Sequence, residues 1–146
     1  MAAEHTARAA WRGDLMGGRG SFSLGSGAAT DVELTWRARA EDASAGTSPE
    51  ELLAAALASC FSMALAHGLA QAGTPPTRIL TEATATFDRT DAGFRVTTIR
   101  LRVEGQAEDA DDDSFREAAE TAKENCPVSK ALEGNVAIEL ETAELK

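Results

Sequence analysis

The sequence predicts an α+β fold, in which an antiparallel-rich sheet surrounds a long buried central helix. One observation is a segment near the middle of the chain that is apolar on nearly every helical face. The other is the alternation of apolar and polar residues on both sides of it, which is typical of half-buried strands. The order of three strands, helix, two strands, helix and strand indicates α+β rather than repeated βαβ units. At 146 residues the chain fits a single domain, 1–146.

Three short strands are expected before the central helix, at Thr6–Trp11, Ser21–Leu24 and Asp31–Arg39. Turns rich in Gly and Ser separate them, as is common between strands of a small sheet. The segment Glu41–Thr47 is rich in Ala, Ser and Gly and is expected to form a loop.

The central helix is expected to begin after Ser48 and to end at about Ala72, before Gly73. Ser48 is a typical N-cap, Pro49 suits the first helical position, and Glu51 would complete a capping box. A helix that is apolar all round is a buried one. Because the chain is short, we expect a second subunit to cover part of its surface, in a homodimer.

Two strands are expected next, at Ile79–Asp88 and Phe94–Glu104. In the second of them the apolar positions change parity, so we expect a β-bulge near Thr97–Thr98. A solvated acidic loop is expected at Glu108–Asp113 and a helix at Ser114–Glu124. The helix is expected to break at Asn125–Pro127, before a short turn at Val128–Leu132 and a closing strand at Val136–Leu145.

The composition makes some partners unsuitable. Lys and Arg number 14 and Asp and Glu number 24, so the formal net charge is −10. An acidic protein repels nucleic acid and anionic membrane surfaces. Met1–Gly13 has no signal-like apolar run, and we expect no membrane span of roughly 18 apolar residues. We therefore expect a cytoplasmic protein.

Two cysteines are the candidates for chemistry. Taken alone, Cys60 would be a packing residue of the central helix, because free cysteine is among the most buried residue types. Cys126 lies at a helix break before Pro127, where free backbone N–H groups can stabilise a thiolate. Spacing alone does not distinguish a reactive pair from two inert thiols.

The sequence motifs around the two cysteines resemble those of a known family. The segment Ser48–Leu65, with the sequence SPEELLAAALASCFSMAL, resembles the first cysteine motif of the OsmC/Ohr family of organic hydroperoxide reductases, and Cys126–Ser129 (CPVS) resembles the second. The segments Trp11–Asp14 and Asp91–Phe94 are more similar to the OsmC branch than to the Ohr branch. The resemblance covers essentially the whole chain in the right order.

The resemblance implies a thiol-dependent peroxidase that reduces organic hydroperoxides to alcohols. Cys60 would be the peroxidatic cysteine, Cys126 the resolving cysteine and Glu50 the catalytic glutamate. The family also uses an arginine on an early strand to hold the thiolate, for which Arg39 is the best match and Arg37, expected on the same strand face, is the alternative. An external dithiol, lipoyl-type or small, would reduce the disulfide. The family further implies an intertwined homodimer, with no metal and no organic cofactor.

An arginine is also expected on physical grounds. A thiol with a pKa near ~8.5 is only about 3% thiolate at pH 7, and burial lowers that fraction. Cys60 is three turns into its helix, beyond the reach of the N-terminal helix dipole. An arginine oriented by a carboxylate such as Glu50 would supply the missing charge. We therefore expect a lowered pKa for Cys60.

The spacing of Glu50 and Cys60 bears on the assembly. They are ten residues apart. On one helix that is about 15 Å along the axis and roughly 80° around it. Either the helix is kinked, or Glu50 reaches Cys60 from a partner chain, so that the active sites are shared between subunits.

The alternatives to a peroxidase are a ligand-binding protein, a hydrolase and a metal site. A family member could bind an apolar ligand beside Cys60 without peroxidase turnover. A hydrolase built on Ser59 or Ser62 with His67 lacks a Gly-x-Ser-x-Gly elbow. A metal site formed by the two cysteines with His5 and His67 lacks any paired-ligand spacing.

Overall fold

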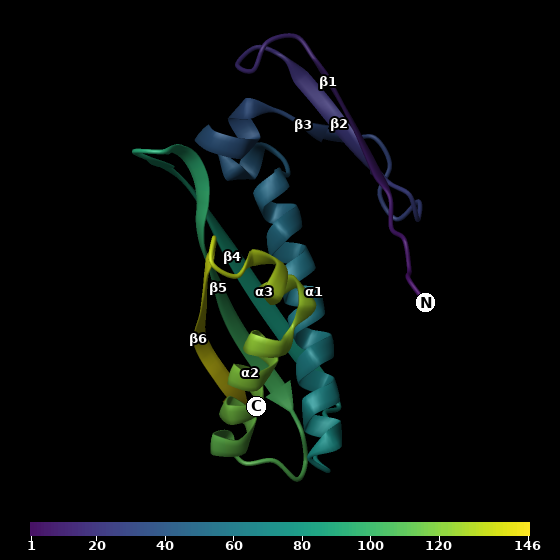
Figure 1. Cartoon of the computed structure of the whole chain (residues 1–146), viewed down its shortest axis with the longest axis vertical. Coiled ribbons are helices and arrows are strands. Elements are labelled where there is room, and N and C mark those ends of the chain that lie inside the picture. Colours follow the sequence, from purple (N-terminus) through teal and green to yellow (C-terminus); the bar gives the residue numbers. More distant parts are fainter. The chain divides into compact units, whose positions relative to one another are not determined.

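The computed structural model describes residues 1–146, which divide into two compact units, Met1–Leu52 and Leu53–Lys146. The long helix follows three strands and precedes two strands, helices and a closing strand, which confirms the α+β class (Figure 1). The strands form two three-stranded sheets, one in each unit, rather than the one sheet that the sequence suggested. The single domain 1–146 stays a prediction.

The first unit contains an antiparallel sheet in the order β1-β2-β3, formed by Ala7–Arg12, Arg19–Leu24 and Val32–Leu34. The first two strands confirm the expected ones. Gly20 faces Trp11 across the pair, and a Cβ atom there would lie 2.4 Å from the Ala10 carbonyl oxygen. The close approach of these two strands therefore requires glycine.

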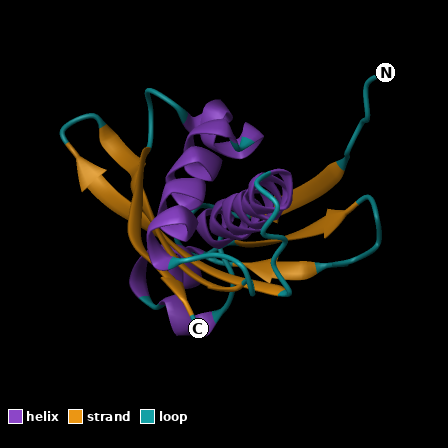
Figure 2. Cartoon of the chain, turned by 90° about the horizontal axis from the view of Figure 1, so that it is seen from below, coloured by secondary structure: helices purple, strands orange, loops and turns teal.

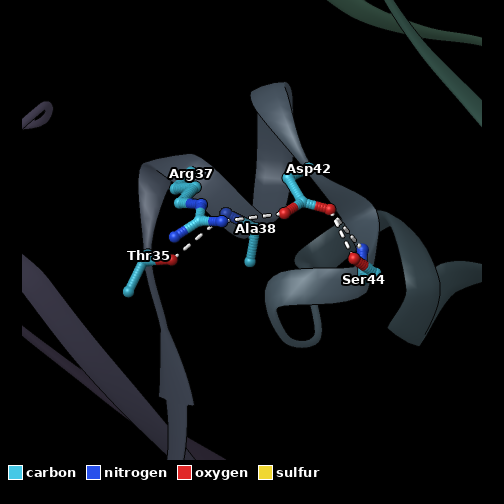
Figure 3. A network of polar contacts seen from close by, with 5 residues as sticks. All are labelled: Thr35, Arg37, Ala38, Asp42 and Ser44. Carbon is cyan, nitrogen blue, oxygen red and sulfur yellow. Dashed lines mark hydrogen bonds and ion pairs between the residues drawn. The ribbon is translucent and has the colours of Figure 1, made fainter.

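The third predicted strand, Asp31–Arg39, is wrong beyond Leu34. Arg37–Glu41 forms a π-helical turn, η1, and Ala43–Ala45 a 3₁₀ turn, η2, within the expected loop. The Thr35 hydroxyl accepts from the Ala38 amide at 3.1 Å, and Asp42 accepts from the Ser44 amide and hydroxyl (Figure 3). These local hydrogen bonds compete with strand pairing.

The central helix α1 (Pro49–Gln71) is unbroken over 23 residues. Ser48 is its N-cap, because the Ser48 hydroxyl accepts from the Glu51 amide at 3.1 Å. The Glu51 carboxylate accepts from the Thr47 hydroxyl, in place of the reciprocal bond expected for a capping box. The helix ends before Gly73, whose φ of 84° is left-handed. The boundaries confirm the prediction, and the kink considered for this helix is absent.

By length and composition, α1 could cross a membrane, which corrects the expectation that no segment would meet that measure. Its large side chains Leu57, Phe61 and Leu65 are nevertheless fully buried against the other elements of the second unit. One side of α1 therefore packs into the core of this unit, whereas its other side is exposed in the single chain. Cytoplasmic location stays a prediction.

The second unit contains the strands β4 (Arg78–Thr90), β5 (Gly93–Gln106) and β6 (Ala137–Leu145), in the order β4-β5-β6. The first pair is antiparallel and the second parallel. Thr86 pairs with Thr98 and Phe87 with Val96, so one residue of β5 has no partner. The predicted bulge near Thr97–Thr98 is confirmed.

Two further helices, α2 (Asp112–Asn125) and α3 (Pro127–Leu132), precede β6. Asp111 caps α2, accepting from the Ser114 amide at 2.7 Å, so the helix begins two residues before the predicted Ser114. The predicted break is confirmed, because Cys126 is both the C-cap of α2 and the N-cap of α3.

The helices of the second unit cover one face of its sheet (Figure 2). From Ile99 onward along β5, the side chains of Ile99, Leu101 and Val103 are fully buried and the intervening ones are exposed. The fully buried side chains come from α1, β5, α2 and the α2–α3 junction: Leu57, Phe61, Leu65, Ile99, Leu101, Val103, Phe115, Ala119 and Cys126. One of the two cysteines is therefore part of the core itself.

Candidate active site

Cys60 and Cys126, 66 residues apart in sequence, are brought together in the second unit. Cys60 lies on α1, is half-buried and packs against the core, whereas Cys126 is fully buried within it. Both cysteines are free thiols, and each thiol lies close enough to shift the pKa of the other. The two cysteines that the sequence singled out are therefore neighbours.

The local structure explains how each thiol is placed. On α1, Cys60 immediately precedes the buried Phe61 and lies three residues after the buried Leu57, so it falls at the edge of the core-facing side. Cys126 is held by its backbone, since its amide donates to Ala122 at 2.9 Å and its carbonyl accepts from Lys130 at 3.0 Å. The helix break therefore turns the Cys126 side chain inward toward α1.

The environment of Cys126 favours its thiolate. Burial by itself would raise the pKa of this thiol. The neighbouring Cys60 thiol, Ser129 and the Val128 amide favour the anion more than burial disfavours it, and the pKa of Cys126 is lowered. The Cys126 side chain makes no regular cap hydrogen bond with the amides of α3. Several weak interactions together stabilise the anion.

The environment of Cys60 acts in the opposite direction. Burial raises the pKa of the Cys60 thiol, and the hydrogen bond and charge of Cys126 raise it further. The Val128 amide opposes this shift without reversing it. In the chain by itself, the negative charge of the pair therefore favours Cys126. This is the reverse of the expectation that the pKa of Cys60 would be lowered.

Arg39 and Glu50 form an ion pair in the first unit. The Arg39 Nε atom is 3.1 Å and 3.2 Å from the two Glu50 carboxylate oxygens, and Nη2 is 2.8 Å from Oε1. The Glu50 side chain is only 7% exposed and that of Arg39 35%. A buried carboxylate that accepts from two nitrogens fixes the guanidinium in one orientation.

Arg37, the alternative to Arg39, has a different partner. Its Nη2 atom is 3.0 Å from Asp42 Oδ2, and its side chain is 69% exposed (Figure 3). Arg37 and Arg39 lie on the helical turn η1, so the idea that both point to one strand face is wrong. Of the two arginines, Arg39 is the one that contacts Glu50.

Glu50 and Cys60 lie on the same unbroken helix, ten residues apart. Straight-helix geometry separates them by about 15 Å along the axis. Because α1 has no break after Glu51, the side chain of Glu50 does not reach the sulfur of its own chain along this helix.

The structure also bears on the hydrolase and metal alternatives. The Ser59 hydroxyl donates to the Ala55 carbonyl at 2.6 Å and the Ser62 hydroxyl to the Ala58 carbonyl at 2.8 Å. Neither hydroxyl has a hydrogen bond to His67, so neither has a base to activate it. No three His, Cys, Asp or Glu side chains are grouped to hold a metal ion.

A fold with two small sheets, a long apolar helix and a cysteine pair between helices defines a class of thiol-bearing α+β proteins. The family model described as OsmC-like protein matches residues 25–141. The chain belongs to the OsmC-like family.

Two curated relatives and one solved structure illustrate the similarity. The peroxiredoxin OsmC of Escherichia coli is 39% identical over 132 residues, which cover 90% of this chain and 92% of that one. The organic hydroperoxide resistance protein OhrB of Bacillus subtilis is 31% identical, over 86% of this chain and 90% of that one. The crystal structure of the B. subtilis OhrB matches with a TM-score of 0.72 and 30% identity, covering 97% of this chain and 98% of that one.

Proposed function

We propose that this protein is a cysteine-dependent peroxidase that reduces organic hydroperoxides to alcohols. The observation that carries the proposal is the pair of neighbouring free thiols, Cys60 and Cys126, in a chain 39% identical to a peroxiredoxin. Relatives named for peroxidase activity or for organic hydroperoxide resistance support a role of this type.

The chemistry proceeds through two sulfur intermediates. The Cys60 thiolate attacks the terminal oxygen of the hydroperoxide, the O–O bond breaks, and the alkoxide leaves and takes a proton to become the alcohol. Cys60 is then a sulfenic acid. The Cys126 thiolate attacks its sulfur and expels hydroxide, which becomes water, and a Cys60–Cys126 disulfide forms. An external dithiol, lipoyl-type or small, reduces this disulfide.

The Arg39–Glu50 pair is proposed to move the negative charge to Cys60. A guanidinium cannot lose its proton and can donate two hydrogen bonds to a thiolate. Glu50 holds it by contacts of 2.8–3.2 Å. Beside Cys60, this cation would counter the burial that raises the pKa of the Cys60 thiol.

The Arg39–Glu50 ion pair that acts on Cys60 is proposed to come from the partner subunit of a homodimer. Because α1 is unbroken, Glu50 and Cys60 of one chain stay about 15 Å apart along it. On its other side α1 leaves an apolar side chain, Met63, 74% exposed three residues after Cys60. A second chain would cover this side and bring its own Arg39 and Glu50 to the sulfur.

Peroxide consumption with a dithiol present tests the function. The wild-type protein should consume cumene hydroperoxide, and Cys60→Ser should not. Steady consumption by Cys60→Ser would contradict the proposal. A wild-type protein that is inactive with several dithiols, yet binds apolar ligands, would favour the alternative of an apolar-ligand carrier.

Mixed dimers test the shared site. Coexpressed Cys60→Ser and Glu50→Gln chains, purified through two different tags, form dimers in which one site retains both wild-type residues. About half of the wild-type activity is expected, because one of two sites is intact. Mixed dimers as inactive as both parent dimers would contradict the shared site.

A further inference from the structure

The hairpin of β1 and β2 ends in a turn, Asp14–Gly18, that presents two large apolar side chains to solvent. The Gly17 amide donates to the Asp14 carboxylate at 2.7 Å and the Gly18 amide to the Asp14 carbonyl at 3.0 Å, so Asp14 closes the turn. Within the turn, Leu15 is 53% exposed and Met16 65%. Turn positions favour Gly, Pro, Asn, Asp and Ser. The geometry of the turn therefore does not explain why these two residues are large and apolar.

The other hairpin of the chain, β4–β5, has a turn of the common kind. Thr90 pairs with Gly93 at its end. The Thr90 hydroxyl donates to the Gly93 carbonyl at 2.9 Å and accepts from the Ala92 amide at 3.2 Å. Polar and small residues are thus enough to connect two long strands in this protein. Leu15 and Met16 are not needed to make a hairpin.

Two arginines lie directly behind the apolar turn. Arg12 on β1 pairs with Arg19 on β2, and like charges directly opposite each other destabilise a sheet. Arg19 lies 3.6 Å from Glu33 in an exposed ion pair, whereas Arg12 has no acidic partner. The segment Arg8–Ser23 contains three arginines and one acidic residue, so its local charge is 3 − 1 = +2 in a chain of net charge −10. The hairpin is therefore a cationic part of an acidic protein.

Trp11 lies at the same level on the opposite face of the hairpin. Its indole Nε1 donates to the Asp14 carbonyl at 3.2 Å. Its ring occupies space that only glycine leaves free, because a Cβ at Gly20 would lie 2.7 Å from the ring and one at Gly18 3.0 Å from Nε1. Trp11 is nevertheless 41% exposed. Tryptophan, with an apolar ring and one N–H donor, is enriched where lipid meets water.

We propose that the turn Asp14–Gly18 docks the protein on the surface of an anionic lipid bilayer, with Leu15 and Met16 in the outer acyl region and Arg12 and Arg19 at the phosphate groups. Leu15 is three residues beyond Arg12, at most about 10 Å at ~3.3 Å per residue. The headgroup layer is roughly 5–8 Å thick on each side of a bilayer. The order of apolar, cationic and aromatic groups along the hairpin therefore matches the order of layers in the lipid.

The net charge of −10 predicts that the chain as a whole is repelled by anionic membranes. The field of exposed charges fades over about 8 Å at physiological ionic strength, so a turn that alone touches the bilayer is affected mainly by its own arginines. Nucleic acid offers phosphates without an apolar layer for Leu15 and Met16. A bilayer supplies both, and docking of this kind is weak and reversible. The proposal does not depend on the peroxidase function.

Cosedimentation with vesicles tests the docking. The wild-type protein should bind vesicles of phosphatidylcholine with one third phosphatidylglycerol, and bind pure phosphatidylcholine at least about tenfold more weakly. About 0.5 M NaCl should remove most of that difference. The Leu15→Ser/Met16→Ser variant should lose about tenfold in binding, because its apolar surface stays in water. Arg12→Gln and Arg19→Gln should each lose about fivefold on the anionic vesicles.

Matched variants elsewhere in the chain control for general changes in polarity and charge. Leu80→Ser removes an apolar side chain that is 50% exposed on β4, and Arg78→Gln removes an exposed cation from the same strand. Both should bind like the wild type, as should Met16→Leu and Arg19→Lys, which keep the chemistry of the turn.

Equal binding to both kinds of vesicle would overturn the proposal, as would Leu15→Ser/Met16→Ser chains that bind like the wild type. A wild-type protein that binds neither vesicle would also overturn it. If the same variant then dissociated the homodimer in lipid-free sedimentation, the turn would belong to the contact between subunits instead.

Fluorescence locates the contact on the molecule. The chain has two tryptophans, so in a Trp36→Phe variant the emission comes from Trp11 alone. Anionic vesicles should shift this emission to shorter wavelength, and the added Leu15→Ser/Met16→Ser substitutions should abolish the shift. Cosedimentation without any shift would show that another surface binds the lipid and would overturn the assignment to this turn.

Discussion

Replacing Arg39 by alanine should destabilise the protein as well as slow its reaction with peroxide. Arg39 is the ion-pair partner of the Glu50 carboxylate, whose side chain is only 7% exposed. Removing one partner of a fully buried pair costs about 3–5 kcal/mol, because the remaining charge is left without compensation. Arg39 is itself 35% exposed, so water compensates for part of the loss. We therefore expect a loss of about 2–3 kcal/mol in the free energy of unfolding.

Urea unfolding followed by circular dichroism measures this loss, at one protein concentration because a dimer's stability depends on it. Arg37→Ala is the matched control. Arg37 lies on the same turn and also forms an ion pair, but its side chain is 69% exposed, so its loss should cost a small fraction of that amount. The Arg39→Ala/Glu50→Gln double variant should recover part of the stability, because the uncompensated charge is removed with the arginine.

Equal losses for Arg37→Ala and Arg39→Ala would refute this reasoning, as would a double variant less stable than Arg39→Ala. Activity is best compared with Arg39→Lys, which retains the positive charge but lacks the two-nitrogen geometry that contacts Glu50. A slower peroxide step in a stable Arg39→Lys protein would separate the catalytic effect from the structural one.

Three further predictions concern other parts of the chain. Cys126→Ser should consume about one hydroperoxide per chain and then stop as a sulfenic or sulfinic acid, as measured by peroxide loss and intact mass; sustained turnover would contradict its role as resolving cysteine. Gly105→Ala should lower the free energy of unfolding in urea by about 1–3 kcal/mol, because the added Cβ would lie 2.3 Å from the ring of the fully buried Phe115. Gly68→Ala is the control and should not destabilise the protein, because its Cβ would enter open space. The Ser114 amide lowers the pKa of the Asp111 carboxyl in the folded protein. The ionised carboxylate therefore stabilises the fold at a pH above its ordinary pKa of 3.8, and this stabilisation is lost as the pH falls through the lower pKa of the folded state. Asp111→Asn should flatten that part of the stability–pH curve.

The parts of the fold that were predictable from the sequence are those that local chemistry determines. Ser48 and Gly73 mark the ends of α1 because an N-cap hydroxyl and a left-handed glycine act within a few residues. The bulge at Thr97–Thr98 was predictable because a change of parity cannot be accommodated in a regular strand.

The turn at Arg37–Glu41 was not predictable in the same way. The alternation from Asp31 onward continues past Leu34, and a period of two cannot show where strand pairing ends. The structure ends it with hydrogen bonds to the side chains of Thr35 and Asp42, which compete with a third strand. The parallel pairing of β5 and β6 is likewise set by tertiary packing rather than by either strand's own pattern.

The nearness of the two cysteines was predictable from the sequence, whereas the opposite pKa shifts of the two thiols were not. The motifs identified Cys60 and Cys126, and the structure makes them neighbours. The lowered pKa of the Cys126 thiol depends on the groups near its sulfur, including Ser129, which the sequence presented only as the last residue of a motif. An arrangement of this kind is a property of tertiary structure.

The distribution of charge leads to a prediction about assembly. Two sulfurs in contact share one negative charge, because a second ionisation would place two anions together. In the chain by itself the charge favours Cys126, whereas attack on a peroxide requires it on Cys60. Along the unbroken α1, the Glu50 that orients Arg39 does not reach the Cys60 of its own chain.

Activity per chain should therefore fall on dilution, over the range in which sedimentation shows the dimer separating into monomers. The thiolate absorbance should change little over that range, since the charge returns to Cys126 rather than being lost. Reaction of the protein with a single equivalent of hydroperoxide, followed at several protein concentrations, measures the rate of the first step alone. A rate per chain that stays constant while the dimer dissociates would show that one chain activates its own Cys60, and the shared site would have to be abandoned.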